Sequence, residues 1–443
     1  MADLKYYIFF FTLFIIAPAT GVVGGYYKKL SNFIFGLSIF FTCRLSESIN
    51  FVSHEFYRGT SRGFEITLVD CLCISLFIIS IFRNKFKDIV FFPPGSTLMV
   101  MYFIFSMMSI INAANITYSL FELFKMIRMY FVYWVFYNYI NSLDDIKVFF
   151  KSMSIVICYI FISVLWDKYI GGRYQARGPF PHQNSLVMYM QIFAGISFAH
   201  FFNSRKFAFK WGWLSAISTM LIIMTLSRGG LLCYAISISI IYFLSIINNF
   251  SKQKVILTLY MLMALFGIGL KSIGTLYERF TTAPKESAHT RVYLAKSAVN
   301  MANDKFFGIG LNNFGVKVNK PFLYSKDSPR YEEKGFKEGL VETSYLMIAA
   351  ETGWLNLLVF LILLSSFYYR NIRMLIKYRK NNYYPLLLGV FGGLTAIYVE
   401  SSLEWVLKQT TNSYQLILVF SILSVLYTKK ILDEPAVNTK EAI

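Results

Sequence analysis

Residues 211–249, WGWLSAISTMLIIMTLSRGGLLCYAISISIIYFLSIINN, contain two apolar runs, 211–227 and 229–249, that are separated by a single arginine, Arg228. An α-helix of about 20 apolar residues is long enough to cross the roughly 30 Å hydrocarbon core of a bilayer. The stretch therefore predicts two membrane-spanning helices that are joined at one membrane surface, with Arg228 at the junction.

The same pattern recurs along the whole chain. Of the 443 residues, 56% are hydrophobic and 19% aromatic, and the mean hydropathy is +0.51. A soluble protein of this length carries far less apolar surface, and a membrane barrel would show alternating segments of about ten residues. We therefore predict an all-α polytopic membrane protein with about 12–14 transmembrane helices. The apolar runs lie near 6–24, 31–43, 64–82, 96–113, 119–141, 149–167, 185–202, 211–227, 229–249, 255–272, 343–368, 384–400 and 413–428.

The net charge of +19 does not indicate nucleic-acid binding, because no nucleic-acid motif accompanies it. The basic residues fall mostly in short connectors between the apolar runs, as the positive-inside rule expects for cytoplasmic loops. These connectors are 83–87, 205–210, 252–254, 370–380 and 429–430. The opposite, outer side then receives the 168–184 loop, the turn at Arg228, the 273–341 loop and the 401–412 turn.

Histidine and cysteine usage predicts neither a metal site nor a disulfide framework. None of the four histidines is paired at metal-ligand spacing, and most of the five cysteines lie within apolar runs. We expect no cofactor.

The domain organisation follows from the one long extramembrane segment. Residues 1–272 are predicted to form an N-terminal helix bundle, 273–341 a large outer loop, 342–430 the C-terminal spans and 431–443 a cytoplasmic tail. Within the loop, Leu294, Ala298 and Met301 recur at helical spacing, which predicts a short amphipathic helix over TRVYLAKSAVNMAND, residues 290–304.

Arginines gather on the predicted outer side: Arg173, Arg177, Arg228 and Arg291. A charge at the edge of the hydrocarbon, such as Arg228, is costly and usually has a partner. Guanidinium groups bind phosphate through two parallel hydrogen bonds, so these arginines are candidate phosphate ligands. The alternative for Arg228 is a side chain that extends to the lipid headgroups.

Further charged residues have structural explanations. Glu351 lies within an apolar run and is predicted to satisfy a buried partner. Glu404 and Lys408 are one helical turn apart and are expected to pair. A third set shares one helix face and forms either a structural ion-pair set or part of a phosphate-binding groove: Glu122, Lys125 and Arg128.

Three motifs in order resemble the bacterial superfamily of O-antigen polymerases and O-antigen ligases. They are Ser227-Arg228-Gly229, then Arg291 followed by Gly308-Ile309-Gly310, and then ETSYLMIAAETGWLN at 342–356. The resemblance covers roughly residues 170–410. It implies a GT-C-like glycosyltransferase that moves glycan from a polyprenyl-diphosphate carrier to an acceptor hydroxyl, without a metal, on the periplasmic face of the bacterial inner membrane.

The resemblance assigns Arg228 and Arg291 to the donor diphosphate. Glycosyl transfer to an alcohol also needs a base, and Glu342 at the predicted loop–helix junction is the candidate, with His182 as a second. The alternative for Glu342 is a helix cap, together with Thr343 and Ser344. Ligases typically have a histidine where this chain has Glu342, so the departure favours a polymerase.

We therefore predict a polymerase that joins undecaprenyl-diphosphate-linked oligosaccharide repeat units into O-antigen or a related surface polysaccharide. A ligase that transfers the glycan to lipid A core or to a protein is the alternative enzyme. A flippase for lipid-linked glycan is the alternative of another class, although no internal repeat of the transporter type is evident. The expected partners are the lipid-linked oligosaccharide, membrane lipid and a chain-length regulator protein.

Overall fold

The computed structural model describes residues 2–83, 88–203, 209–252, 254–259, 285–328, 331–333 and 338–433. Within these ranges almost all regular structure is helical. Six helical segments are long and apolar enough to cross a membrane. They are Leu4–Tyr26, Leu143–Ile170, Gln183–Asn203, Arg228–Asn248, Trp354–Lys377 and Thr410–Thr428. The structure thus confirms an all-α polytopic membrane protein, while the exact number of spans stays a prediction.

The N-terminal part of the bundle contains the ten helices α1 to α10, and residues 254–259 are also helical. A short π-helical segment, Thr12–Ile16, joins the first two of them into one continuous rod. The helices are α1 (Ala2–Phe11), α2 (Ala17–Tyr26), α3 (Lys28–Phe41), α4 (Leu68–Arg83), α5 (Ser96–Met108), α6 (Ile116–Tyr139), α7 (Leu143–Leu165), α8 (Gln183–Asn203), α9 (Phe209–Met224) and α10 (Arg228–Asn248). Short helical extensions follow α5 and α7, at Ser109–Asn112 and Trp166–Ile170.

The C-terminal part contains three long helices and three that belong to the loop region. These are α12 (Lys285–Asp304), α13 (Phe314–Lys317), α14 (Ser344–Thr352), α15 (Trp354–Lys377), α16 (Tyr384–Glu400) and α17 (Thr410–Thr428). A single 3₁₀ turn, Val406–Lys408, precedes α17. The predicted span at 255–272 and the first part of the 273–341 loop lie largely outside the described residues, as does most of the 431–443 tail.

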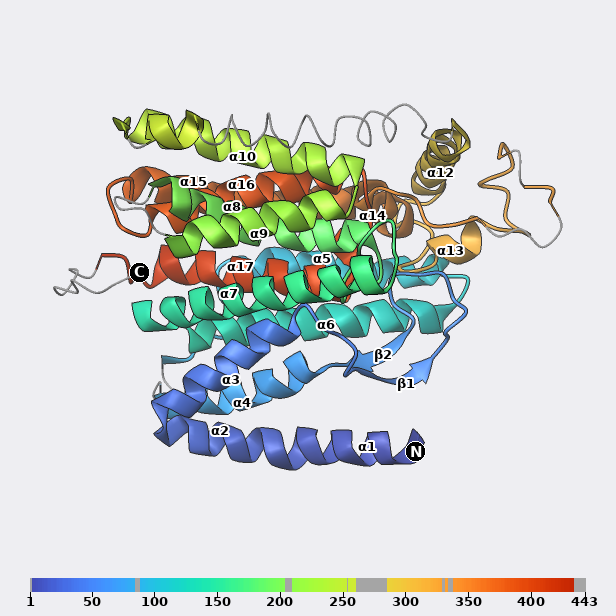
Figure 1. Cartoon of the computed structure of the whole chain (residues 1–443). Helices are drawn as coiled ribbons and strands as arrows, with labels where there is room; N and C mark the ends of the chain where they lie inside the picture. Colours follow the sequence, from blue (N-terminus) through green and yellow to red (C-terminus); the bar gives the residue numbers. More distant parts are fainter. Residues whose placement is uncertain are drawn as a thin grey trace.

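The long helices run side by side along one common direction (Figure 1). One end of the bundle, which we call the loop end, carries α12, α13, α14 and a two-stranded antiparallel hairpin of β1 (Ile49–Ser53) and β2 (Gly63–Ile66). The basic residues at 370–380 and 429–430 follow the courses of α15 and α17 to the opposite end. The outer loops and these basic connectors therefore lie at opposite ends of the bundle, as the charge distribution predicts.

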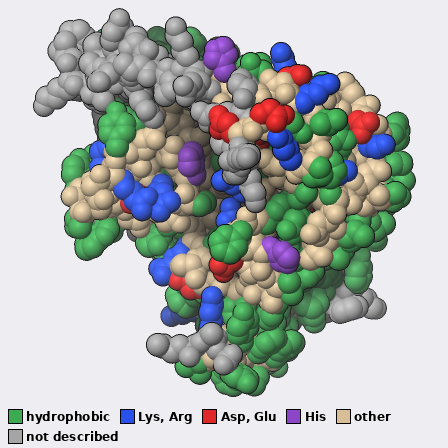
Figure 2. Space-filling model, turned by 90° about the vertical axis from the view of Figure 1, so that its right-hand side faces the viewer, with side chains coloured by type: hydrophobic (Ala, Val, Ile, Leu, Met, Phe, Trp, Pro, Cys, Tyr) green, Lys and Arg blue, Asp and Glu red, His purple; other side chains and the backbone are tan. Residues whose placement is uncertain are grey.

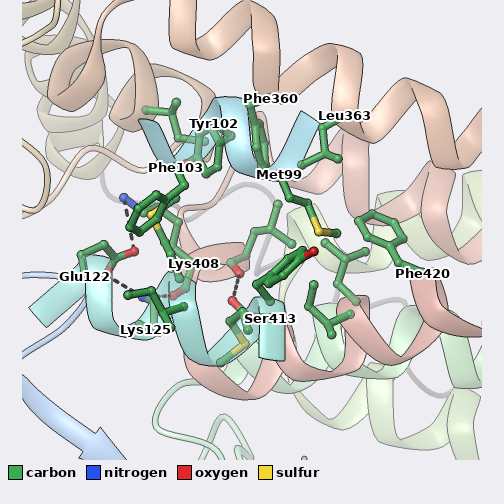
Figure 3. A pocket seen from close by; sticks show the side chains of 18 of the residues that line it. Met99, Tyr102, Phe103, Glu122, Lys125, Phe360, Leu363, Lys408, Ser413 and Phe420 are labelled. Atoms are coloured by element: carbon green, nitrogen blue, oxygen red, sulfur yellow. Dashed lines mark hydrogen bonds and ion pairs between the residues drawn. The ribbon is translucent and has the colours of Figure 1, made fainter. Parts of the chain in front are cut away.

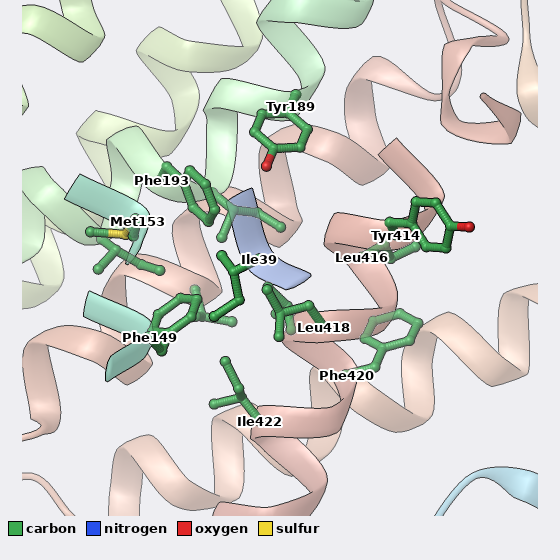
Figure 4. Packing of buried hydrophobic residues seen from close by; sticks show 14 of the residues in the cluster. Ile39, Phe149, Met153, Tyr189, Phe193, Tyr414, Leu416, Leu418, Phe420 and Ile422 are labelled. Atoms are coloured by element: carbon green, nitrogen blue, oxygen red, sulfur yellow. The ribbon is translucent and has the colours of Figure 1, made fainter. Parts of the chain in front are cut away.

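Helix α8 lies at the centre of the bundle and is buried on nearly every face. Its neighbours α16 and α17 are also buried almost throughout, and all three carry apolar residues around the whole helix rather than on one stripe. Figure 4 shows part of this core, where Tyr189 and Phe193 of α8 lie with Phe149 of α7 and Leu418 of α17. Helices nearer the exterior expose large apolar side chains, such as Phe14, Ile162 and Phe243, as expected of a surface in contact with lipid.

The predicted span at 343–368 is wrong as one helix, because the chain breaks at Gly353. This glycine has a φ of +87°, and a Cβ at this position would collide with the backbone carbonyl of Phe306. Only glycine adopts this conformation readily. The apolar run therefore divides into α14, which belongs to the loop end, and α15, which spans. Glu351 consequently lies on α14 and not inside a membrane-spanning helix.

Candidate active site

The predicted amphipathic helix in the long loop is confirmed, and it carries Arg291. Leu294, Ala298 and Met301 of α12 are buried, and they pack with Met347 and Ala350 of α14 in one apolar cluster. The polar side of α12 is left exposed. Glu342 lies two positions before α14. The packing of α12 on α14 therefore fixes the position of Arg291 relative to Glu342.

Arg291 lies between two carboxylates. Its Nη2 atom forms an ion pair with Glu342 and lies 3.6 Å from Oε1 of Glu404. Arg291 and Glu342 are partly exposed, whereas Glu404 is buried. The Glu342 side chain forms no cap bond with α14, whose N-cap is Thr343, so the helix-cap explanation of Glu342 is not supported. The three residues define the acid–arginine cluster.

Hydrogen bonds from Ser344 to two backbone carbonyls hold the segments that carry the two carboxylates together. The amide and hydroxyl groups of Ser344 donate to the carbonyl of Glu404, at 3.3 and 2.9 Å, and the Ser344 amide also donates to Ser401 at 2.9 Å. The start of α14 is thereby fastened to the turn between α16 and α17. Glu342 and Glu404, which are 62 positions apart in the sequence, are brought to the same guanidinium.

Both carboxylates bind protons more tightly than exposed ones. Burial raises the pKa of Glu342 above its ordinary value, and Arg291 lowers it in part. Burial also raises the pKa of Glu404 to about 7; a hydrogen bond with Asn184 opposes this shift and the charge of Glu342 adds to it. Acids whose pKa values are raised by burial are candidates for proton transfer.

Arg228 opens α10 at the loop end, as predicted. Ser227 caps the helix, and a Cβ at Gly229 would lie 3.5 Å from Leu403, which is next to Glu404. Gln191 of α8 bridges the carbonyl of Gly230 at 3.1 Å and the buried Glu400 at 3.2 Å. Within the part of the chain that the structure describes, Arg228 is exposed and no carboxylate lies within ion-pair distance of it. Among the described residues its guanidinium thus has no carboxylate partner, which leaves it accessible to a ligand from this part of the chain.

The other predicted arginines hold their own loop together. Nε of Arg173 lies 2.7 Å from Asp167, and Arg177 donates to the carbonyl of Pro181 at 2.9 Å. His182 ends this loop, two residues before Asn184; partial burial and the charge of Arg177 lower the pKa of His182. These contacts give Arg173 and Arg177 structural roles, and the ring of His182 accepts a hydrogen bond from the amide of Asn184 at 3.3 Å.

A second group of charged residues consists of two carboxylates and two lysines. All four are buried, and their charges alternate in sign. Nζ of Lys408 lies 2.8 Å from Glu351 and 3.8 Å from Glu122. Glu122 lies 2.6 Å from Lys125, and Figure 3 shows Glu122, Lys125 and Lys408 together. The predicted pairing of Glu404 with Lys408 is therefore wrong: Glu404 faces Arg291 instead. The buried partner expected for Glu351 is confirmed as Lys408. An unpaired buried charge would be strongly destabilising, so these residues stabilise one another.

Arg128, on the same face of α6, has separate partners. It lies 2.7 Å from Asp70 and donates to the hydroxyl of Tyr414 at 2.5 Å. Asp70 in turn accepts from Tyr414 and from Thr67. The structure thus supports the structural explanation for the charged face of α6.

An apolar cavity of about 270 Å³ lies beside these charges (Figure 3). Tyr102 of α5, Phe360 of α15 and Phe420 of α17 line it, and Glu122, Lys125 and Lys408 form its polar end. Val100 and Ile127, which also line the cavity, are exposed on the exterior of the bundle. The cavity is therefore apolar except at this polar end, and some of the residues that line it reach the exterior of the bundle.

The segment FFGIGLNNFG, residues 306–315, attaches the long loop to the bundle by close backbone approach. Ile309 donates to the carbonyl of Ala350 at 2.9 Å and Gly310 to that of Glu351 at 3.0 Å. A Cβ on Gly310, whose φ is +112°, would lie 2.5 Å from Ala113. The segment therefore seats α14 against the ends of α5 and α6.

Charged and polar side chains gather on this end of the molecule. Figure 2 shows lysines, arginines, acids and histidines across the face, with hydrophobic side chains along its margins. Within the described ranges, no group of three or more His, Cys, Asp or Glu side chains is placed to hold a metal ion.

A bundle of apolar helices that presents an arginine between two acids at its loop end is a multi-pass membrane protein with a candidate acid–base site at that end. The sequence model of a family described as O-antigen ligase matches residues 213–361, which include Arg228, Arg291 and Glu342. The match confirms the predicted relationship to the superfamily of O-antigen ligases and polymerases. It supports a glycosyltransferase-type function on a lipid-linked glycan. Among curated proteins no match was found.

Glu404 was not among the catalytic candidates that the sequence suggested. It lies outside the matched segment, in a short turn whose partner residues are far away in the sequence. The available signal was an acid in one of the few short turns predicted on the outer side.

Proposed function

We propose that the protein is a glycosyltransferase of the bacterial inner membrane that polymerises undecaprenyl-diphosphate-linked oligosaccharide repeat units, with its loop end in the periplasm. The observation that carries the proposal is the acid–arginine cluster, in which Arg291 lies between Glu342 and Glu404. The family match over the segment that contains Arg228, Arg291 and Glu342 supports it.

In the proposed reaction, Arg228 and Arg291 bind the donor diphosphate. As the diphosphate arrives, the guanidinium of Arg291 exchanges Glu342 for phosphate oxygens, and Glu342 becomes free to accept a proton. The acceptor hydroxyl then gives its proton to Glu342 while its oxygen forms a bond to the anomeric carbon of the donor sugar. The bond from that carbon to the diphosphate breaks, and the electron pair leaves with the undecaprenyl diphosphate.

In the proposed site, the arginines lower the activation barrier by stabilising negative charge. Negative charge grows on the leaving diphosphate in the transition state, and the fixed positive charges of Arg228 and Arg291 stabilise it there. A direct displacement of this kind inverts the configuration at the anomeric carbon. The proposal needs no cofactor, because arginine supplies the charge that a metal ion supplies elsewhere.

The apolar cavity beside Lys125 supports a lipid-linked substrate. Its walls of Tyr102, Phe360 and Phe420 match a hydrocarbon chain, and its opening at Ile127 faces the bilayer. We assign this cavity to part of the carrier's isoprenoid chain. Because Glu122 and Glu351 neutralise the two lysines at its polar end, the diphosphate is not placed there. A chain-length regulator protein remains a proposed partner of the polymerase.

A ligase is the second candidate, because the matching family is described as O-antigen ligase. Glu342, at the position where ligases typically have a histidine, favours the polymerase. Glycan profiling of a deletion strain separates the two functions. We expect single-repeat chains on the lipopolysaccharide core, as a lost polymerase requires. Bare core together with carrier-linked polymer would identify a ligase, and an unchanged profile would refute both.

The affinity for the donor is expected to fall as the pH rises through the pKa of Glu404. Below about 7 this residue is neutral, and above it a second carboxylate competes with the diphosphate for Arg291. The KM for the lipid-linked donor should therefore increase between about pH 6 and about pH 8. In Glu404→Gln, which is neutral throughout, the increase should disappear. Glu333→Gln, an exposed acid of the same loop, is the control and should keep the wild-type dependence.

A further inference from the structure

A second cavity, of about 680 Å³, opens at the loop end, apart from the acid–arginine cluster and from the apolar cavity. One wall is the tip of the β1–β2 hairpin, residues 53–58, and the other comes from α13 and the residues after it, up to Lys320. Tyr118, in the first turns of α6, closes its base. We call it the hairpin cavity. Neither the proposed reaction nor the family match, which begins at residue 213, accounts for its hairpin wall.

The hairpin cavity combines aromatic faces with hydrogen-bonding groups. Phe56 is fully exposed. His54 is also exposed, and its ring meets Tyr118 edge-on at 5.4 Å between centroids. The hydroxyl of Ser53, the carboxylate of Glu55 and the imidazole of His54 supply polar atoms beside these rings.

Stacking and hydrogen bonds hold Tyr57 and the hairpin tip in place. Tyr57 stacks on Tyr118 with centroids 3.8 Å apart and donates its hydroxyl to the carbonyl of Asn312. The side chain of Asn312 accepts from the amide of Thr60 at 3.0 Å and donates to the carbonyl of Ser61 at 2.8 Å. The hairpin tip is thus fastened to the segment that carries α13. A preformed site loses little conformational entropy when a ligand binds.

From these features we propose that the hairpin cavity binds carbohydrate, as a subsite for the glycan portion of the lipid-linked substrate. Sugar rings present an apolar face of C–H groups, which packs against aromatic rings, and a rim of hydroxyl groups, which bond to carboxylate, imidazole and hydroxyl partners. Phe56 and His54 provide the packing surface, and Ser53 and Glu55 the rim contacts. The assignment of this glycan as substrate rests on the proposed function.

The chain path connects the hairpin cavity with the candidate active site. Gly308 touches the end of α14, and Gly315 lines the hairpin cavity. Seven residues of extended chain span at most about 25 Å, and α14 adds about 14 Å between its end and its start beside Glu342, so the two sites lie within about 40 Å of each other. An oligosaccharide of several sugars can occupy the hairpin cavity while its terminal unit lies at Glu342.

The test measures glycan binding without turnover. Oligosaccharides are released by mild acid from the surface polysaccharide of the producing bacterium, so that they carry no lipid. Their affinity for the purified full-length protein in lipid nanodiscs is measured by calorimetry, with saturation-transfer NMR to identify the sugar protons in contact. We expect the wild type to bind the glycan. In the double variant His54→Ala/Phe56→Ala the affinity should fall about tenfold or more, since a bound sugar no longer buries an aromatic ring. Phe306→Ala, another exposed aromatic at the loop end, is the matched control and should bind as the wild type does.

The outcomes separate this inference from the proposed function. Equal affinities in the wild type and the double variant, or no binding by the wild type, would overturn the carbohydrate site, whatever the enzyme activity. Loss of affinity in the double variant together with unchanged folding by circular dichroism would support it. If the protein bound the glycan at this cavity but did not extend lipid-linked repeats, the proposed function would fail while the binding site remained.

Discussion

Replacing Glu342 with glutamine is expected to slow glycosyl transfer by about a hundredfold to ten-thousandfold, the usual contribution of a general base. Glutamine has nearly the shape of glutamate and still accepts a hydrogen bond from Arg291, so the loop end should keep its structure. What is lost is the ability to take the proton of the acceptor hydroxyl. The initial rate of repeat-unit extension by purified protein in lipid measures the effect, together with the amount of protein in the membrane.

Two further variants make this test specific. Glu333→Gln removes an exposed carboxylate from the same loop and should leave the rate unchanged. His182→Ala examines the second candidate base, which lies near Asn184 and Glu404. A wild-type rate in Glu342→Gln combined with a large loss in His182→Ala would transfer the role of base to the histidine.

The second large effect is expected for the two arginines. Lysine keeps the positive charge but lacks the planar pair of donors that binds a diphosphate at two points. Arg228→Lys and Arg291→Lys should each lower kcat/KM for the lipid-linked donor about tenfold to a hundredfold, as the loss of a charged hydrogen bond predicts. Part of the Arg291 effect should appear in kcat, because the charge it stabilises is larger in the transition state.

Arg44→Lys is the matched control for the arginine variants. Arg44 lies between α3 and β1, pairs with Glu47 and takes no part in the acid–arginine cluster, so its replacement should change kcat/KM little. Near-normal values for both Arg228→Lys and Arg291→Lys would mean that general positive charge suffices. The two-point binding of the diphosphate would then have to be given up.

The sequence predicted those parts of the structure that depend on local pattern. The spacing of Leu294, Ala298 and Met301 was enough to place α12, because an amphipathic helix buries one face wherever it packs. Hydropathy likewise located the apolar runs that became long helices. It did not separate α14 from α15, since apolar residues continue across Gly353 and the helix break is a matter of backbone conformation.

Long-range contacts were not accessible in this way. The spacing of Glu404 and Lys408 suggested a pair, but the turn directs them to different elements, Arg291 on α12 and Glu351 on α14. The strands β1 and β2 are short, and their hairpin is held in place by Asn312, which is far away in the sequence. The spacing of Arg291 and Glu342 in the sequence does not show that they lie close together. They could be proposed as one site because the family resemblance assigns both to it.

The break at Gly353 has a mechanical consequence. Helix α14 is fastened at its start to the turn at Ser401 and Glu404, and at its end to Lys408, so both of its ends are tied to the same short connection between α16 and α17. Helix α15 begins only after the glycine. A spanning helix tilts when the surrounding bilayer becomes thicker or thinner. Such tilting of α15 would be absorbed by rotation about the Gly353 backbone, and the distance between Glu342 and Arg291 would be insulated from the thickness of the membrane.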